Sequence, residues 1–169
     1  MKEGEFILSV LVSNQFGVLT RVSSLFSRRG YNIDSLTVGE TQDPQYSRMT
    51  ISATGDEATK EQIVKQLSKL FDVKKIEVME RDQTIVRELM LIKVEAPQAT
   101  RSEIMEAVNI YRGKIVDLTP ESVTIEITGE QTKLEAFVEF LKQYGIVELC
   151  RTGITAIGRG TSCLTIDHK

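Results

Sequence analysis

The chain has 169 residues, which is enough for one medium-sized domain or two small ones. With 41% hydrophobic residues and a formal net charge of -3, it is predicted to be a soluble globular protein that binds no nucleic acid, because nucleic-acid-binding domains usually carry a basic excess. No apolar stretch is long enough to span a membrane, and the apolar run at 6–12 lacks the basic flank and cleavage site of a signal peptide.

Strand-like and helix-like patterns alternate from the start of the chain. The apolar run at 6–12 predicts a strand, and it ends in the turn Asn14-Gln15-Phe16-Gly17. Gly30 is placed to end the following helix in a left-handed conformation. That helix is predicted by five apolar residues at helical spacing: Val18, Leu19, Val22, Leu25 and Phe26.

The first half continues with two strands, a helix and a strand. Residues 31–40 and 49–53 are predicted strands, separated by residues of turn composition. Asp56 is the expected N-cap of the second helix, and residues 73–79 form the last strand. The buried stripe of this helix is expected to contain Ile63, Val64, Leu67, Leu70 and Phe71.

The second half repeats the same order of elements. Predicted strands lie at 89–94, 114–118, 123–127 and 146–149. The first helix of this half is expected to start at a capping box formed by Thr100 and Glu103, and Gly113 corresponds to Gly30. Its two helices are expected to bury Ile104, Met105, Val108 and Tyr111, and then Leu134, Phe137, Val138 and Leu141.

This repetition predicts the fold class, which is α+β with two ferredoxin-like βαββαβ units. We place the boundary between them near Glu80, which gives domains 1–80 and 81–169. The glycine-rich segment 153–162 lacks the Lys-Ser/Thr ending of a phosphate-binding loop, so we expect a strand with a flexible tail there.

Side chains suited to catalysis or metal binding are scarce. The only histidine, His168, lies next to the C-terminal residue, where disorder is common. Cys150 and Cys163 match no metal-ligand spacing and are too few for a disulfide framework, so we expect reduced thiols in the cytoplasm. The sequence therefore predicts no catalytic residue, no metal site and no enzyme activity of its own.

The turn at Gly17 is the candidate binding site. A strand that leads through a glycine turn into a helix leaves unpaired backbone N–H groups at the positive end of the helix dipole, which suit a carboxylate or phosphate. Gly17 and Asn14 equally fit a turn with only a structural role. The spacing alone leaves both interpretations open.

Residues 8–19 resemble the opening of the ACT domain, a small-molecule-binding module of βαββαβ topology. The resemblance continues with one family, the regulatory small subunit of acetolactate synthase, which is also called acetohydroxyacid synthase. The segments that carry it are Arg21-Val22, 25–39, 47–51, 62–70 and Val73 in the first half, and 87–94, 112–120, Gly129, 133–137 and 151–153 in the second.

The resemblance implies a regulatory role. Such subunits bind the thiamine-diphosphate-dependent catalytic subunit, activate it, and make it sensitive to feedback inhibition by valine or a related branched-chain amino acid. Thiamine diphosphate, Mg²⁺ and FAD are then expected in the catalytic subunit, and this chain is expected to hold no cofactor. In the family the effector lies between the ACT domains of two chains, which implies a homodimer.

Carried across by this resemblance, the effector site has two walls. One chain would supply Asn14, Gln15, Phe16, Gly17, Val18 and Leu19, and its partner Asn32 and Ile33. The N–H groups of Gly17, Val18 and Leu19 would hold the carboxylate, and the two asparagines could serve both polar ends of an amino acid. Many ACT domains have proline at the position of Phe16, so this turn is expected to be less stiff.

The second unit has Ala96-Pro97-Gln98-Ala99 in place of the glycine turn. We therefore predict that it binds no amino acid and instead contacts the catalytic subunit. Two alternatives remain open at this stage, which are a stand-alone ACT-type amino-acid sensor and a small enzyme on a ferredoxin-like scaffold.

Overall fold

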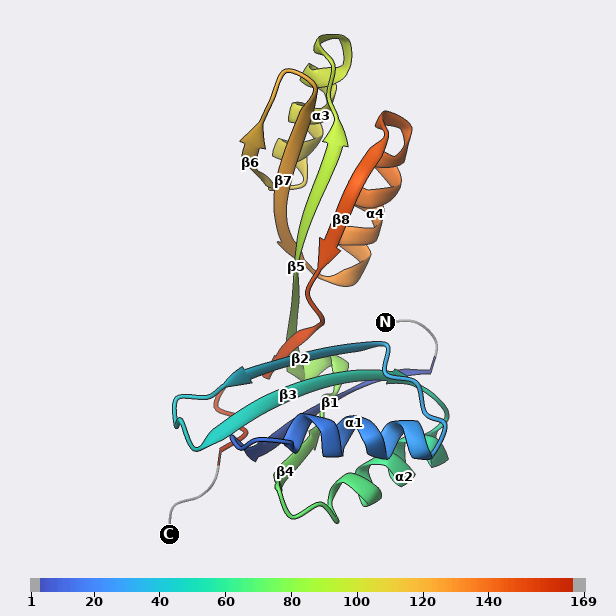
Figure 1. Cartoon of the computed structure of the whole chain (residues 1–169), viewed down its shortest axis with the longest axis vertical. Coiled ribbons are helices and arrows are strands. Elements are labelled where there is room, and N and C mark those ends of the chain that lie inside the picture. The colour runs from blue at the N-terminus through green and yellow to red at the C-terminus, as the bar shows by residue number, and fades with distance from the viewer. Residues whose placement is uncertain (1–3, 166–169) are drawn as a thin grey trace. The chain divides into compact units, whose positions relative to one another are not determined.

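The computed structural model describes residues 4–165 (Figure 1). His168 lies outside the described residues. The strands are β1 (Glu5–Ser13), β2 (Ser35–Glu40), β3 (Tyr46–Thr54), β4 (Val73–Val78), β5 (Thr84–Glu95), β6 (Lys114–Leu118), β7 (Ser122–Gly129), β8 (Ile146–Arg151) and β9 (Thr155–Gly158). The α-helices are α1 (Val18–Arg28), α2 (Glu57–Leu67), α3 (Gln98–Ile110) and α4 (Gln131–Leu141), and short 3₁₀ helices occupy Arg81–Gln83 and Lys142–Tyr144.

The chain forms two compact units, and the predicted boundary at residue 80 differs from the observed one. Unit 1 contains the residues up to Val86 together with the segment from Gly153 onward, and unit 2 contains Arg87–Thr152. In the returning segment, β9 pairs with β5, which spans the boundary between the units. The segment belongs to unit 1 because Ile154 and Ala156 are buried in a cluster with Ile7 and Met79. The segment was correctly expected to contain a strand, but its partner strand is far away in the sequence.

Unit 1 is the ferredoxin-like βαββαβ fold that the sequence predicted. Its sheet has the order β2-β3-β1-β4, with antiparallel pairing throughout, and α1 and α2 cover one face (Figure 1). Alternate residues of β3, among them Met49 and Ile51, point into the core between sheet and helices, as the period of two requires. Phe71, however, lies beyond the end of α2 and is 88% exposed, so its predicted place in the buried stripe is wrong.

Glycines fix both ends of α1. Gly17 precedes the helix at φ 82°. At the other end Gly30 has φ 69°, and the Tyr31 N–H donates to the Phe26 carbonyl at 3.0 Å, which is the left-handed helix end expected at this position. The length and direction of α1 are therefore determined by two positions that L-amino acids with a side chain rarely occupy.

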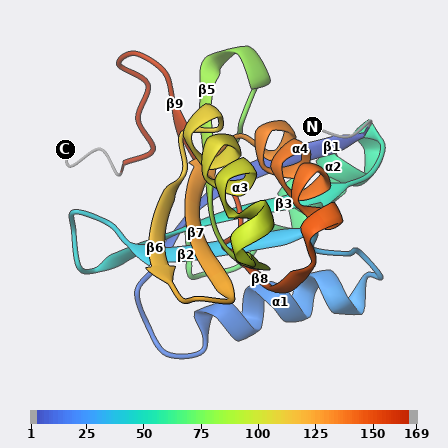
Figure 2. The same ribbon diagram turned by 90° about the horizontal axis from the view of Figure 1, so that it is seen from above.

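Unit 2 has the same topology, with the sheet order β6-β7-β5-β8. Figure 2 shows α3 and α4 side by side over one face of this sheet, and a separate hydrophobic core lies between the two layers. Three local predictions are wrong here. Met105, expected in the buried stripe of α3, is 39% exposed. Helix α3 begins at Gln98 after Pro97, upstream of the expected capping box, and Arg112 instead of Gly113 has the positive φ, at 57°.

Asp56 caps α2 as predicted, because its carboxylate accepts from the Thr59 N–H at 2.8 Å. The hydrogen bonds from Thr59 lower the pKa of Asp56. Because the folded-state pKa is lowered, the ionised Asp56 carboxylate stabilises the fold at pH values above its unfolded-state pKa. This stabilisation is lost as the pH falls through the folded-state pKa. We expect Asp56→Asn, which keeps the cap but cannot ionise, to lose less thermal stability than wild type between neutral and acidic pH, measured as Tm against pH. Equal acid sensitivity of the two proteins would contradict this role.

Candidate functional site

The turn between β1 and α1 presents backbone donors on the surface of unit 1. Within residues 4–165 the N–H groups of Gly17 and Leu19 donate to no protein acceptor, as is usual in the first turn of a helix. The Val18 N–H, in contrast, points back to the Gln15 carbonyl at 3.4 Å. Two of the three predicted donors are therefore available for an anion, and they lie at the positive end of α1.

Asn14 is held by the hairpin that joins β2 to β3. Its backbone N–H donates to the Gln45 carbonyl at 2.7 Å, and its side-chain amide donates to the Pro44 carbonyl at 2.9 Å and to Glu40 Oε2 at 3.2 Å. Both side-chain amide hydrogens are thus directed into the hairpin. The side-chain carbonyl oxygen of Asn14 is the atom left to accept a hydrogen bond from a cation. The sequence alone left open whether Asn14 has a structural role in the turn or contacts a ligand.

Apolar side chains stand exposed beside these polar groups. Phe16 at the tip of the turn is fully exposed, and Leu19 in the first turn of α1 is 45% exposed. Val18 between them points inward and is buried in the core of unit 1. The turn therefore offers donors and apolar surface together, which suits a ligand that has an anionic end and an apolar body.

Two charged groups at the turn were not predicted. Arg21, one helical turn after Gly17, donates through Nε to the carboxylate of buried Asp72 at 2.6 Å, and its Nη1 lies 3.0 Å from the position that a Cβ on Gly17 would occupy. Glu40 at the end of β2 accepts a hydrogen bond from the Asn14 side chain at 3.2 Å. The turn thus has a cation and a carboxylate close by, although the sequence separates these residues widely.

Gly17 is the position in the turn where a side chain is least tolerated. Its φ of 82° is strained for any L-residue with a Cβ, and an added methyl group would also press on the Arg21 guanidinium. We expect Gly17→Ala to lower the free energy of unfolding by about 1–2 kcal/mol. Urea denaturation would measure this loss. Gly39→Ala, at a site with negative φ and open space, is the matched control, and an equal loss in both variants would contradict the proposed strain.

Asn32 and Ile33, the other predicted site residues, lie away from the turn. Asn32 is exposed and donates to Asp34 Oδ1 at 2.8 Å, and half-buried Ile33 packs against the core of unit 1. Both follow the C-terminal end of α1, whereas the turn precedes its N-terminal end. Eleven residues of helix span about 16 Å. One chain therefore does not bring the two predicted walls together, and each chain carries them as two separate surfaces, here called half-sites of the predicted site.

The corresponding turn of unit 2 is closed by its own side chain. Arg101 donates through Nε and Nη2 to the Ala96 carbonyl at 3.2 and 3.0 Å, and through Nη2 to the Pro120 carbonyl. The Ala96 N–H donates to the Glu121 carbonyl at 2.8 Å, and Ala96 is fully buried. The guanidinium of Arg101 therefore holds the two carbonyl groups at this strand end, whereas among the described residues the turn of unit 1 has no such side chain across it.

Among residues 4–165, no three His, Cys, Asp or Glu side chains are close enough to hold a metal ion. No helix of this described part is both long and apolar enough to cross a membrane. Cys150 and Cys163 are exposed free thiols.

The fold and the turn together define an ACT-type module joined to a second ferredoxin-like unit, and comparisons with known proteins agree. Residues 8–75 match the family model of the AHAS small subunit-like ACT domain, and residues 87–160 match the small subunit of acetolactate synthase. A probable acetolactate synthase small subunit from Methanothermobacter thermautotrophicus is 50% identical over 95% of this chain and 96% of its own length. The acetolactate synthase small subunit of Mycolicibacterium smegmatis is 53% identical over 90% of each chain.

A solved structure extends the match to three dimensions. The crystal structure of the small subunit of acetolactate synthase from Thermotoga maritima superposes with a TM-score of 0.87 at 44% identity, covering 94% of this chain and 99% of that one. The chain belongs to the family of acetolactate synthase small subunits. It is therefore a regulatory, non-catalytic subunit, and its partner is the catalytic subunit of that enzyme.

Proposed function

We propose that this chain activates the catalytic subunit of acetolactate synthase and makes it sensitive to feedback inhibition by valine or a related branched-chain amino acid. The two separate half-sites on unit 1 are the observation that best supports an effector site shared between two chains. Thiamine diphosphate, Mg²⁺ and FAD would reside in the catalytic subunit, with the assembled enzyme in the cytoplasm. Unit 2, whose turn is closed by Arg101, would contact the catalytic subunit.

Pairing of two copies through β2 would join the half-sites. Strand β2 is an edge strand of the unit 1 sheet, so its outer row of backbone groups has no partner strand among the described residues. A two-fold axis that places two β2 strands antiparallel brings the start of one strand beside the end of the other. Asn32 and Ile33 lie just before the start, and Glu40 with its bonded Asn14 lies at the end. The homodimer would therefore contain two equivalent pockets.

The groups gathered in such a pocket complement an α-amino acid. The Gly17 and Leu19 N–H groups and the Arg21 guanidinium would face the carboxylate, while the Asn14 carbonyl oxygen and Glu40 would face the ammonium group. Burial of a branched aliphatic side chain against Ile33 of the other chain would add about 1.5–3 kcal/mol. One methylene changes binding by only about 1–3 kcal/mol, so valine, leucine and isoleucine must be compared directly.

Reconstitution tests this proposal. Purified chain is added to the separately purified catalytic subunit, and acetolactate formation is followed with and without valine, leucine and isoleucine. We expect a higher rate with the chain present and inhibition by at least one of the three amino acids. An unchanged rate would contradict activation, and amino-acid binding without activation would indicate the stand-alone sensor. Product formation by this chain alone would indicate an enzyme.

A further inference from the structure

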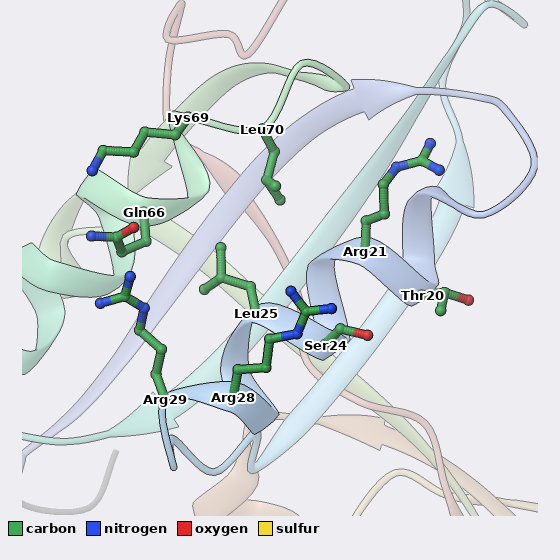
Figure 3. Close-up of a pocket in the computed structure, with 9 residues that line it drawn as sticks. All are labelled: Thr20, Arg21, Ser24, Leu25, Arg28, Arg29, Gln66, Lys69 and Leu70. Atoms are coloured by element: carbon green, nitrogen blue, oxygen red, sulfur yellow. The ribbon is translucent and has the colours of Figure 1, made fainter.

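A basic cleft lies between α1 and α2 of unit 1. Its volume is about 580 Å³, and it is lined by residues of α1, of α2 and of the segments that directly follow them. Figure 3 shows Leu25 and Leu70 pointing toward one another in the middle of the cleft, with Arg29 next to Gln66 at one end and Arg21 toward the other. The cleft therefore has an apolar floor and basic ends.

The charges of this cleft are of one sign. Arg21, Arg28, Arg29 and Lys69 line it, and no acidic side chain does. Arg21 is paired with Asp72, but the side chains of Arg28, Arg29 and Lys69 form no hydrogen bond or ion pair with any of residues 4–165. A cation at Arg28 complements the C-terminal end of α1. Arg29, the C-cap of α1, and Lys69, just after the C-cap of α2, also lie at helix C-terminal ends. Each helix end would be served by its own cation, so this effect does not explain why three unpaired cations gather in one cleft of a chain with net charge -3.

We propose that the cleft binds a small anion with two or more phosphate groups. Guanidinium groups bind phosphate through paired, charge-assisted hydrogen bonds, and Arg28 and Arg29 would supply two such groups with Lys69 as a third charge. The volume falls within the range of about 300–1,000 Å³ typical of small-molecule sites. The Leu25–Leu70 floor would contact the apolar part of an organic phosphate. A concave site with charges at both ends favours a compact anion over an extended acidic polypeptide.

The cleft and the effector turn share one side chain. Arg21 lines the cleft and also touches the space beside Gly17. An anion in the cleft would thus lie one side chain away from the turn. Apart from Arg21, the proposed phosphate site uses different residues from the amino-acid site, and its existence does not depend on the function proposed above.

Calorimetric titration of the full chain with sodium tripolyphosphate and with pyrophosphate tests the site. At about 0.15 M salt, where distant surface charges are screened, we expect saturable binding of one anion per chain. Arg28→Gln/Arg29→Gln should weaken it by about tenfold or more, and Lys69→Gln should weaken it measurably by itself. Arg112→Gln/Lys114→Gln removes the same number of charges from exposed residues of unit 2 and should leave binding unchanged.

Several results would overturn the proposal. Absence of saturable binding, or equal weakening in the control variant, would show that the phosphates are attracted only non-specifically to surface charges. Tighter binding of hexaglutamate than of tripolyphosphate, lost in the same cleft variants, would assign the cleft to an acidic polypeptide instead. Circular dichroism of each variant verifies folding, and the single Lys69→Gln substitution provides the test if the double variant unfolds.

Discussion

Asn14→Ala and Asn32→Ala are each expected to weaken binding of the amino-acid effector by about 10- to 100-fold, the range for loss of a hydrogen bond to a charged group. The reason is that each substitution removes a polar partner from a different wall of the proposed pocket. A mixed dimer of the two variants should contain one site that lacks both asparagines and one intact site. Calorimetry of the mixed dimer should therefore recover binding of near wild-type affinity at half the number of sites.

This experiment separates a shared site from a site within one chain. If both walls came from one chain, every site of the mixed dimer would be damaged and no tight binding would return. Asn109→Ala is the matched control, because Asn109 is an exposed asparagine of unit 2 whose side chain forms no hydrogen bond with any of residues 4–165. Weakening by this control as well would show that the effect does not arise at the effector site.

Phe137→Ala is expected to lower the free energy of unfolding of unit 2 by about 3–5 kcal/mol. Phe137 is fully buried in the core of that unit, and its ring lies 4.9 Å from the ring of Tyr111, so truncation removes both buried area and an aromatic contact. Phe26→Ala is the matched substitution in unit 1, where Phe26 is equally buried. Hydrogen exchange read by mass spectrometry would assign the loss of protection to one unit or the other.

The expected pattern follows from two cores that share no residue. Phe137→Ala should increase exchange mainly in α3, α4 and the strands beneath them, and effector binding by unit 1 should be retained. Phe26→Ala should do the reverse, with loss of effector binding, since α1 carries the turn at one end. Uniform loss of protection in both variants would show that the units unfold as one.

The repeated fold could be predicted from the sequence because its signals are local. Apolar residues recur at the helical period in α1 and at the strand period in β3, and glycines end the elements. Contacts between residues from different elements could not be predicted in this way. The partner of β9, the pairing of Arg21 with Asp72 and the hydrogen bonds of Arg101 depend on residues brought together only by folding.

In the candidate site, too, local features could be predicted from the sequence and contacts between distant residues could not. The turn from Asn14 to Leu19 is visible in the sequence because a glycine follows an apolar strand and precedes a helix. The role of Glu40 is not visible, since an acidic residue at a strand end has no pattern that marks it as a neighbour of Asn14. The hydrogen bond from the Val18 N–H to the Gln15 carbonyl likewise depends on backbone geometry that residue spacing does not specify.

Unit 2 is inserted within unit 1, and this connectivity affects the order in which the chain can fold. The ribosome releases residues 4–80, with the whole effector turn, long before Ile154 and Ala156 emerge to cover Ile7 and Met79. Until then one face of the first sheet lacks its final cover. A fragment that ends near residue 80 would keep every residue of the turn and still expose that apolar face. The last segment of the chain therefore completes the first unit, and its removal should favour association of the nascent or truncated chains.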